Sequence, residues 1–233
     1  MIDAIGLDAD DTLWENETFF RLTEAEFSAL LADHGEAETI AARLFETERT
    51  NLEHYGYGIK GFMLSMIQTA IELTDGTVDG RTIGRILELG REMLAHPVDL
   101  LPGVEEALDA LAGRQLILIT KGDLMDQERK IAASGLAERF AAVEILADKS
   151  TEAYARVLHR HGVAAKHFLM AGNSMRSDVL PALELGGWGV LVPHDLTWAA
   201  EHAQSPDHPR LHQLSSLAEL PDLILRLEEG VPA

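Results

Sequence analysis

Five short apolar segments constrain the fold of this chain more than any other feature. They occupy residues 2–7, 115–120, 143–147, 167–171 and 187–192. Short apolar runs of this kind are typical of strands buried on both faces. The last four alternate with helical stretches, which is the pattern of a parallel sheet covered by helices on both faces. We therefore expect an α/β core.

A long helical stretch separates the first apolar segment from the others. Apolar residues recur at helical spacing between Phe19 and Leu31 and again between Ile83 and Leu94. Residues 61–73 are apolar on nearly every side, so we expect them at the centre of a small bundle. The predicted domains are an α/β core of residues 1–14 and 97–233 and an inserted helical domain of residues 15–96. An insertion at this point of the chain is expected over the carboxyl ends of the strands, as a lid.

The overall charge restricts the partners of the chain. The formal net charge is −20, from 39 acidic and 19 basic residues, and no basic patch offsets it. Such a surface repels nucleic acids and anionic membranes, so neither is expected as a partner. The chain has no cysteine, which excludes thiol nucleophiles and zinc–thiolate sites. It shows neither a signal peptide nor an apolar run long enough to cross a bilayer, so a cytoplasmic location is expected.

Acidic residues directly follow the first apolar segment. Asp8 and Asp10 lie two positions apart, so an extended chain would direct both side chains the same way. Two such carboxylates can hold a divalent cation, or one can attack a substrate while the other moves protons. Asp11 is interpreted as a turn or helix-cap residue.

Polar residues also follow the next three strands of the core. Thr120, Lys121 and Gly122 end one strand, where a hydroxyl and backbone amides can bind an anion, although a plain helix cap explains them as well. Lys149 follows the next strand and can pair with a carboxylate and a phosphate together. Residues 172–178, GNSMRSD, follow the fourth, and Asn173 and Asp178 offer oxygen ligands for a hard cation. Each signal is weak alone, but four such groups after four strands favour a common site.

These motifs resemble those of the haloacid dehalogenase-like superfamily of phosphohydrolases. DADDT at residues 8–12, Thr120, Lys149 and GNSMRSD at residues 172–178 occur in the order of its motifs. The helical insertion matches the position of that superfamily's helical cap. The resemblance implies a Rossmann-like parallel-sheet core with an inserted all-α cap domain. It also implies a Mg²⁺-dependent phosphomonoester hydrolase that acts on a small phosphorylated metabolite.

The resemblance also implies the role of each site residue. Asp8 would be the nucleophile that forms an aspartyl-phosphate, and Asp10 the general acid and base. Thr120, with Lys121 and Gly122, would bind phosphoryl oxygens, and Lys149 would neutralise Asp8 and the phosphate. The Mg²⁺ ligands would be the Asp8 carboxylate, the Asp10 backbone carbonyl, and Asn173 or Asp178.

The motifs depart from the family pattern at one position, and they are compatible with other functions. Asn173 stands where the superfamily often has an aspartate, so the ligand set carries less charge. Asp178 then binds the metal directly, binds it through water, or orients Lys149. A phosphomutase shares the same motifs, and a non-catalytic metabolite-binding member is a weaker alternative that only Asn173 favours. Asp10 disfavours dehalogenation, since halide leaves without a proton. It also disfavours phosphonate hydrolysis, for which Lys60 is the candidate amine, and Lys60 is otherwise a substrate-contact candidate.

Overall fold

The computed structural model describes residues 1–230. The chain divides into two compact units. The core unit contains Met1–Glu17, Val98–Lys121 and the residues from Lys130 onward, and the helical unit contains Thr18–Pro97 and Gly122–Arg129. The sequence pattern places residues 122–129 in the core, whereas the structure groups them with the helical unit.

The core unit is built on a six-stranded parallel sheet with strand order β3-β2-β1-β4-β5-β6. Its strands are β1 (Ala4–Leu7), β2 (Gln115–Lys121), β3 (Ala142–Leu146), β4 (Phe168–Gly172), β5 (Trp188–Leu191) and β6 (Leu211–Gln213). The first five confirm the predicted strands. The sequence missed β6, because its three residues include two polar ones and carry no apolar pattern.

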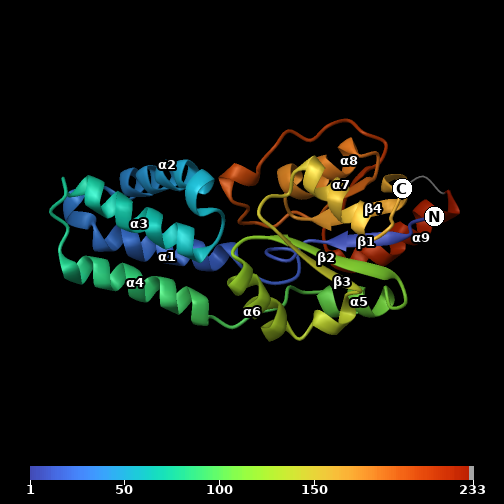
Figure 1. Ribbon diagram of the computed structural model, residues 1–233, viewed down its shortest axis with the longest axis horizontal. Helices are drawn as coiled ribbons and strands as arrows, with labels where there is room; N and C mark the ends of the chain where they lie inside the picture. Colours follow the sequence, from blue (N-terminus) through green and yellow to red (C-terminus); the bar gives the residue numbers. More distant parts are fainter. Residues whose placement is uncertain (231–233) are drawn as a thin grey trace. The chain divides into compact units, whose positions relative to one another are not determined.

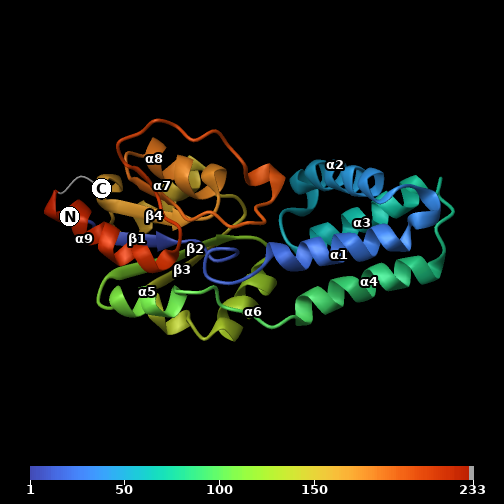
Figure 2. The same cartoon turned by 180° about the vertical axis from the view of Figure 1, so that it is seen from behind.

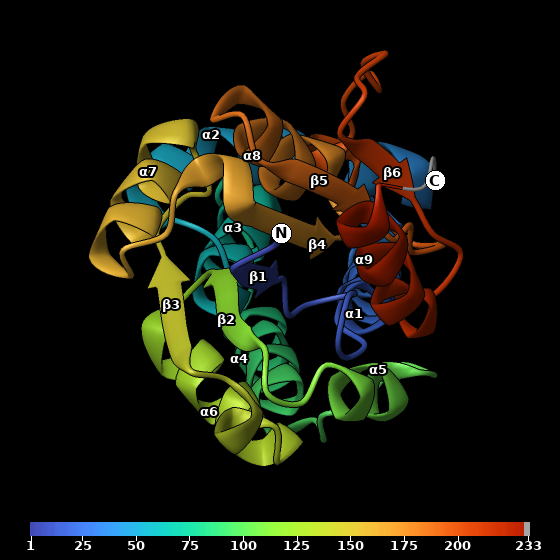
Figure 3. The same ribbon diagram turned by 90° about the vertical axis from the view of Figure 1, so that its right-hand side faces the viewer.

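Helices cover both faces of this sheet, as Figure 3 shows. On one face α5 (Val104–Ala110), α9 (Leu220–Glu229) and the end of α6 (Leu124–Ser134) pack on side chains such as Leu7 and Leu118. On the other face α7 (Thr151–Arg160) and α8 (Leu180–Glu184) pack on side chains such as Ile117 and Met170. Both faces of the strands are therefore buried, which explains their continuous apolar runs. The predicted fold class is confirmed.

The strand order has a switch point between β1 and β4. The chain runs from β1 to β2 and β3 on one side of β1, and then crosses to β4 on the other side. The connections that leave two such strands diverge to opposite faces, so the crevice at their carboxyl ends is where open α/β sheets bind ligands. Asp8 lies at this point, and its backbone N–H donates to the Ala171 carbonyl at 3.0 Å.

The helical unit contains four long helices, seen from two sides in Figures 1 and 2. They are α1 (Glu17–Leu30, whose first residue belongs to the core unit), α2 (Ala37–Tyr55), α3 (Ile59–Leu73) and α4 (Gly80–Ala95). Phe27, Leu44, Met66 and Ile86 contribute one residue from each helix to a shared apolar core. None of the helices in the described chain is long and apolar enough to cross a bilayer.

Helix α3 contacts the other three helices, so residues 61–73 lie at the centre of the bundle as expected, but some of their apolar side chains are exposed. Phe62, Met66 and Ala70 of α3 are buried, but Leu64 is 40% and Ile71 43% exposed. Helix α3 therefore packs against α2 and α4 and keeps some apolar side chains on the surface of the unit. Apolar composition alone does not tell which side chains of such a helix are exposed.

Candidate active site

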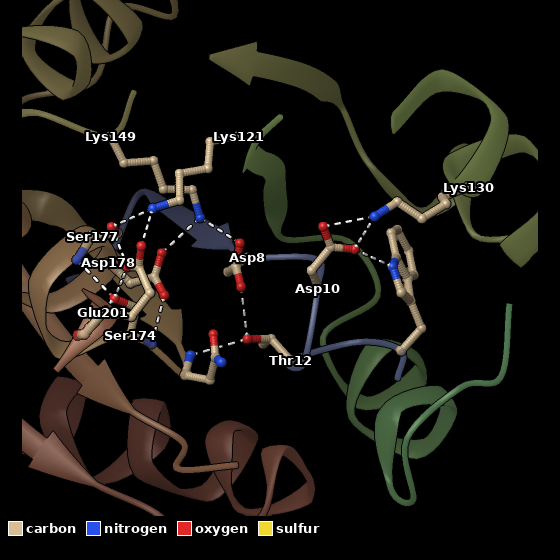
Figure 4. Close-up of polar contacts among 12 residues, drawn as sticks. Asp8, Asp10, Thr12, Lys121, Lys130, Lys149, Ser174, Ser177, Asp178 and Glu201 are labelled. Carbon is tan, nitrogen blue, oxygen red and sulfur yellow. Dashed lines mark hydrogen bonds and ion pairs between the residues drawn. The ribbon is translucent and has the colours of Figure 1, made fainter. Parts of the chain in front are cut away.

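The carboxylates of Asp8 and Asp178 both contact the ammonium of Lys149 at the switch point of the sheet. The Lys149 ammonium donates to Asp8 Oδ1 and, at 2.7 Å, to Asp178 Oδ1. Thr12 Oγ1 donates to the other Asp8 oxygen at 3.0 Å. All three charged side chains are buried, with relative exposures of 4% for Lys149, 6% for Asp8 and 1% for Asp178. Figure 4 shows this cluster, with Lys149 and Lys121 above the two carboxylates. The structure thus brings together three of the predicted site residues.

The charges of this cluster do not balance. Two carboxylates face one ammonium, and the whole group lies out of solvent. Burial and the charge of Asp178 raise the pKa of Asp8 from its ordinary 3.8 to about 7, although Lys149 acts in the opposite direction. The pKa of Lys149 lies well above its ordinary value, because Asp178 and Asp8 outweigh the effect of burial. An added cation would restore the balance and keep Asp8 ionised.

The turn after β4 is shaped around Asp178. The Ser174 N–H donates to Asp178 Oδ2 at 2.9 Å, and Ser174 Oγ accepts the Ser177 N–H at 2.9 Å. Residues Met175–Val179 form a π-helical turn, a rare geometry that is frequent at functional sites. Gly172 is required here, since a Cβ at this position would overlap the Asp178 carboxylate. This packing explains the glycine of the GNSMRSD motif.

The oxygen atoms around Asp8 suit a hard cation. The Asn173 N–H donates to Thr12 Oγ1 at 3.0 Å, which places Asn173 beside the Asp8 loop. Within residues 1–230 its side-chain amide has no hydrogen-bond partner, whereas both Asp178 oxygens are already bonded. The donors are therefore carboxylate and amide oxygens beside an uncompensated negative charge. This set fits Mg²⁺.

Asp10 does not lie alongside Asp8, so the expectation of a shared direction is wrong. Both Asp10 oxygens accept from the Lys130 ammonium, at 2.7 and 2.8 Å, and Oδ1 also accepts from Trp14 Nε1 at 2.7 Å. In Figure 4 the Asp10 side chain points toward Lys130 and away from the Asp8 carboxylate. The reason is that β1 ends at Leu7 and the chain then turns, with the Leu13 N–H bonded to the Ala9 carbonyl at 2.7 Å. The twofold alternation of a strand does not extend into a turn.

Asp11 is the helix-cap residue that the sequence predicted. It has a positive φ of 60°, and its Oδ1 accepts from the backbone N–H groups of Asn16 and Glu17 at 2.8 and 2.9 Å. Asp11, Glu15 and His194 also bring ligand atoms within 4.8 Å of one another. The Asp11 carboxylate already accepts hydrogen bonds at the start of α1, and His194 Nδ1 accepts from the Leu196 N–H at 3.3 Å. These contacts give Asp11 and His194 structural roles.

The predicted anion-binding residues lie at the end of β2. Thr120 is buried, and the neighbouring Lys121 ammonium donates to Ser177 Oγ at 2.8 Å and to Glu201 Oε1. Gly122 has a φ of 141°, and it is the first residue of the segment that belongs to the helical unit. Lys60 also lies in the helical unit, where it pairs with Asp123 at 2.9 Å. Its predicted contact with substrate stays a prediction.

Glu201 is a buried charge that sequence analysis missed. It lies in a short turn, Ala199–Glu201, and its Oε2 accepts from the hydroxyls of Ser174 and Ser177 at 2.5 Å each. Burial alone would raise the pKa of Glu201, but Lys121 and the two serines lower it to about 2. Glu201 thereby ties β2 to the turn after β4. No motif marks it, because it lies in the long connection between β5 and β6 and follows no strand directly.

The core of this chain is a doubly wound parallel sheet, with buried carboxylates and lysines at its switch point. This arrangement is typical of α/β enzymes whose active site contains an aspartate at the end of a strand. Residues 2–186 match the haloacid dehalogenase-like hydrolases, and the chain belongs to this family. The resemblance inferred from the motifs is confirmed. A comparison with curated protein sequences gave no match.

Solved structures support the same assignment. A haloacid dehalogenase-like family hydrolase from Xanthomonas campestris is 42% identical with a TM-score of 0.89, over 98% of this chain and 93% of that chain. A 2-haloacid dehalogenase from Pseudomonas syringae is 21% identical with a TM-score of 0.63, over 97% and 100%. A predicted phosphoglycolate phosphatase from Haemophilus somnus is 14% identical with a TM-score of 0.63, over 96% and 98%. The last two show a common fold only.

Proposed function

We propose that this hydrolase is a Mg²⁺-dependent phosphomonoesterase that acts on a small phosphorylated metabolite through an aspartyl-phosphate on Asp8. The observation that carries the proposal is the buried Asp8 carboxylate, bound to Lys149 beside a second carboxylate, at the switch point of the sheet. Phosphoryl transfer depends mainly on positioning and charge neutralisation. This cluster supplies a fixed nucleophile and a neighbouring cation. The family assignment supports an enzyme of the hydrolase class.

The first half of the reaction transfers the phosphoryl group to the protein. An Asp8 carboxylate oxygen attacks phosphorus, and the bond from phosphorus to the ester oxygen breaks. The electron pair stays on the leaving oxygen, which takes a proton from Asp10. Lys149 holds Asp8 in place, while the Thr120 hydroxyl and nearby backbone amides bind the phosphoryl oxygens. Mg²⁺ bound to Asp8, the Asp10 carbonyl and Asn173 or Asp178 would offset the charge of the phosphoryl group.

The second half of the reaction releases phosphate. Asp10 takes a proton from a water molecule whose oxygen attacks phosphorus. The bond between phosphorus and the Asp8 oxygen breaks, and the electron pair returns to the carboxylate. In an in-line displacement the entering and leaving oxygens lie on opposite sides of phosphorus. The direction of Asp10, away from the Asp8 carboxylate, is compatible with a role on the far side.

Asp10 is also the reason to prefer phosphate esters over haloacids. A halide ion leaves without a proton, whereas an alkoxide is a poor leaving group unless an acid protonates it. The carboxylate held by Lys130 and Trp14 at this position suits the second case, because it can carry the proton that the alkoxide needs. The structural neighbours named dehalogenases share the fold at identities too low to transfer their substrate.

Phosphate release across a panel of small phosphomonoesters, with and without Mg²⁺, tests the proposal. Wild type should release phosphate only with the metal, and Asp8→Asn should remove the activity, while the exposed Asp33→Asn in the helical unit keeps it. Chloride release from 2-chloropropionate in place of phosphate release would show a dehalogenase. Phosphate that moves to another hydroxyl of the same sugar would show a mutase. Binding of a metabolite with no turnover of any substrate would show the non-catalytic alternative.

A further inference from the structure

Lys130 contacts both carboxylate oxygens of Asp10, the proposed acid and base. Its ammonium lies 2.7 Å from Asp10 Oδ1, 2.8 Å from Oδ2 and 3.2 Å from Asn16 Oδ1. Its side chain is only 10% exposed. Trp14 Nε1 also donates to Asp10 Oδ1, at 2.7 Å. The Asp10 carboxylate is thus held by two side chains, one from 120 residues further along the chain.

Burial of a lysine at this place is costly without a specific partner. Lys130 lies in α6 next to Ile131, which packs in the apolar core below the sheet. A buried ammonium loses hydration and side-chain freedom, which only close charged partners offset. The chain has only five lysines, and three of them are each paired with a different acid: Lys121 with Glu201, Lys130 with Asp10, and Lys149 with Asp8. In a chain of net charge −20, this placement indicates a role at the site rather than on the surface.

The direction of the Asp10 carboxylate is the property that Lys130 controls. An aspartate in a turn has several accessible rotamers, and the contact of one ammonium with both oxygens selects one of them. In this rotamer the Asp10 carboxylate points away from the Asp8 carboxylate and toward Lys130.

We propose that Lys130 is the positioning residue of Asp10, which it holds on the leaving-group side of the phosphoryl group. The inference rests on the proposed phosphomonoesterase function and extends it to a residue outside the sequence motifs. Lys130 acts through Asp10 and does not touch the substrate. Its removal therefore impairs the proton transfer that Asp10 performs and spares the attack by Asp8.

Two substrates with different leaving groups test this assignment. An aryl phosphate such as p-nitrophenyl phosphate releases a stabilised phenolate that needs no proton, whereas an alkyl phosphate releases an alkoxide that does. Since general acid catalysis contributes roughly 100-fold or more, Lys130→Met should lower kcat/KM for the alkyl phosphate at least about tenfold more than for the aryl phosphate. Lys130→Arg keeps the contact with both oxygens, so its ratio of kcat/KM for the alkyl phosphate to kcat/KM for the aryl phosphate should lie close to that of wild type. Equal losses on both substrates would mean a merely structural role.

A double-mutant cycle and a matched control sharpen the result. Asp10→Asn should show the same selective loss, and Lys130→Met added to Asp10→Asn should cause little further loss, because both changes affect one proton transfer. Additive losses would overturn the assignment. Lys166→Met is the control, since Lys166 lies in the turn before β4, at the amino end of the sheet, and should keep both activities.

The indole N–H signal of Trp14 gives a readout that does not depend on turnover. Lys130→Met should shift this NMR signal as Asp10→Asn does, and leave those of Trp188 and Trp198 in place, because the indole shares its acceptor with Lys130. An unchanged Trp14 signal would show that Lys130 does not hold Asp10. If wild type hydrolyses no phosphomonoester, the proposed function fails, and the NMR result still decides whether Lys130 positions Asp10.

Discussion

The carboxylates of Asp8 and Asp178 accept hydrogen bonds from the same ammonium group, although 170 positions separate them in the chain. This shared cation ties the end of β1 to the turn after β4. It also leaves the pair with one negative charge too many in a buried place. The chemistry proposed for the site and its cost to stability both follow from this imbalance.

Asp8→Asn should abolish activity and stabilise the metal-free protein. The raised pKa of Asp8 means that the folded state binds its proton more tightly than the unfolded state, so wild-type stability falls as the pH rises from about 4 to about 7. The variant lacks this titration, and its advantage should grow across that window to roughly 1–3 kcal/mol. Thermal unfolding with EDTA at several pH values measures it. A variant that is less stable than wild type at pH 7.5 would contradict the imbalance.

Addition of Mg²⁺ should raise the thermal midpoint of wild type, and Asn173→Asp should strengthen this effect. A second anionic ligand increases the charge that the metal neutralises, so the Mg²⁺ concentration for half-maximal stabilisation should fall by roughly tenfold. Without metal the same variant should be less stable than wild type, because it adds charge next to Asp8. Titrations of the midpoint with Mg²⁺ test both statements. An unchanged Mg²⁺ requirement would place the ion away from Asn173.

Glu201→Gln should lower the free energy of unfolding at neutral pH, and this difference from wild type should disappear in acid. The pKa of Glu201 is lowered to about 2 in the folded protein from an ordinary 4.5, so its ionised form stabilises the fold above about pH 4.5. That contribution disappears as the pH falls from about 4.5 to 2. We expect a loss of roughly 1–3 kcal/mol at pH 7, typical of hydrogen bonds to a charged group. Urea unfolding at pH 7 and pH 3 measures the difference, with the exposed Glu53→Gln as control.

Gly172→Ala should destabilise the protein and reduce activity together. The new Cβ overlaps the Asp178 carboxylate, which must move away from Lys149 or force the turn to shift. Overpacking of this kind costs roughly 1–3 kcal/mol. Gly84→Ala is the matched control, since nothing lies within 4 Å of a Cβ there and the helix should gain stability. Full activity of Gly172→Ala would show that the turn adapts without loss of the Lys149 contact.

The sequence alone determined the architecture and most of the site. Apolar runs predicted five of the six strands, because strands buried on both faces need continuous apolar segments. The order of polar residues after them predicted that Asp8, Lys149 and Asp178 lie together, since the carboxyl ends of parallel strands share one edge of a sheet. Asp11 was identified as a cap from its place in a turn. These features follow from local pattern and chain order.

The tertiary structure alone decided the partners of each charge. Asp10 points to Lys130 because the chain turns after Leu7, and no sequence pattern pairs residues 120 positions apart. Glu201 enters the site from a turn without a motif, and β6 adds a strand of three residues. Whether two charged groups form a buried ion pair depends on their distance and burial, and therefore on how separate elements pack. The apolar period of a strand or helix, in contrast, can be recognised in the sequence itself.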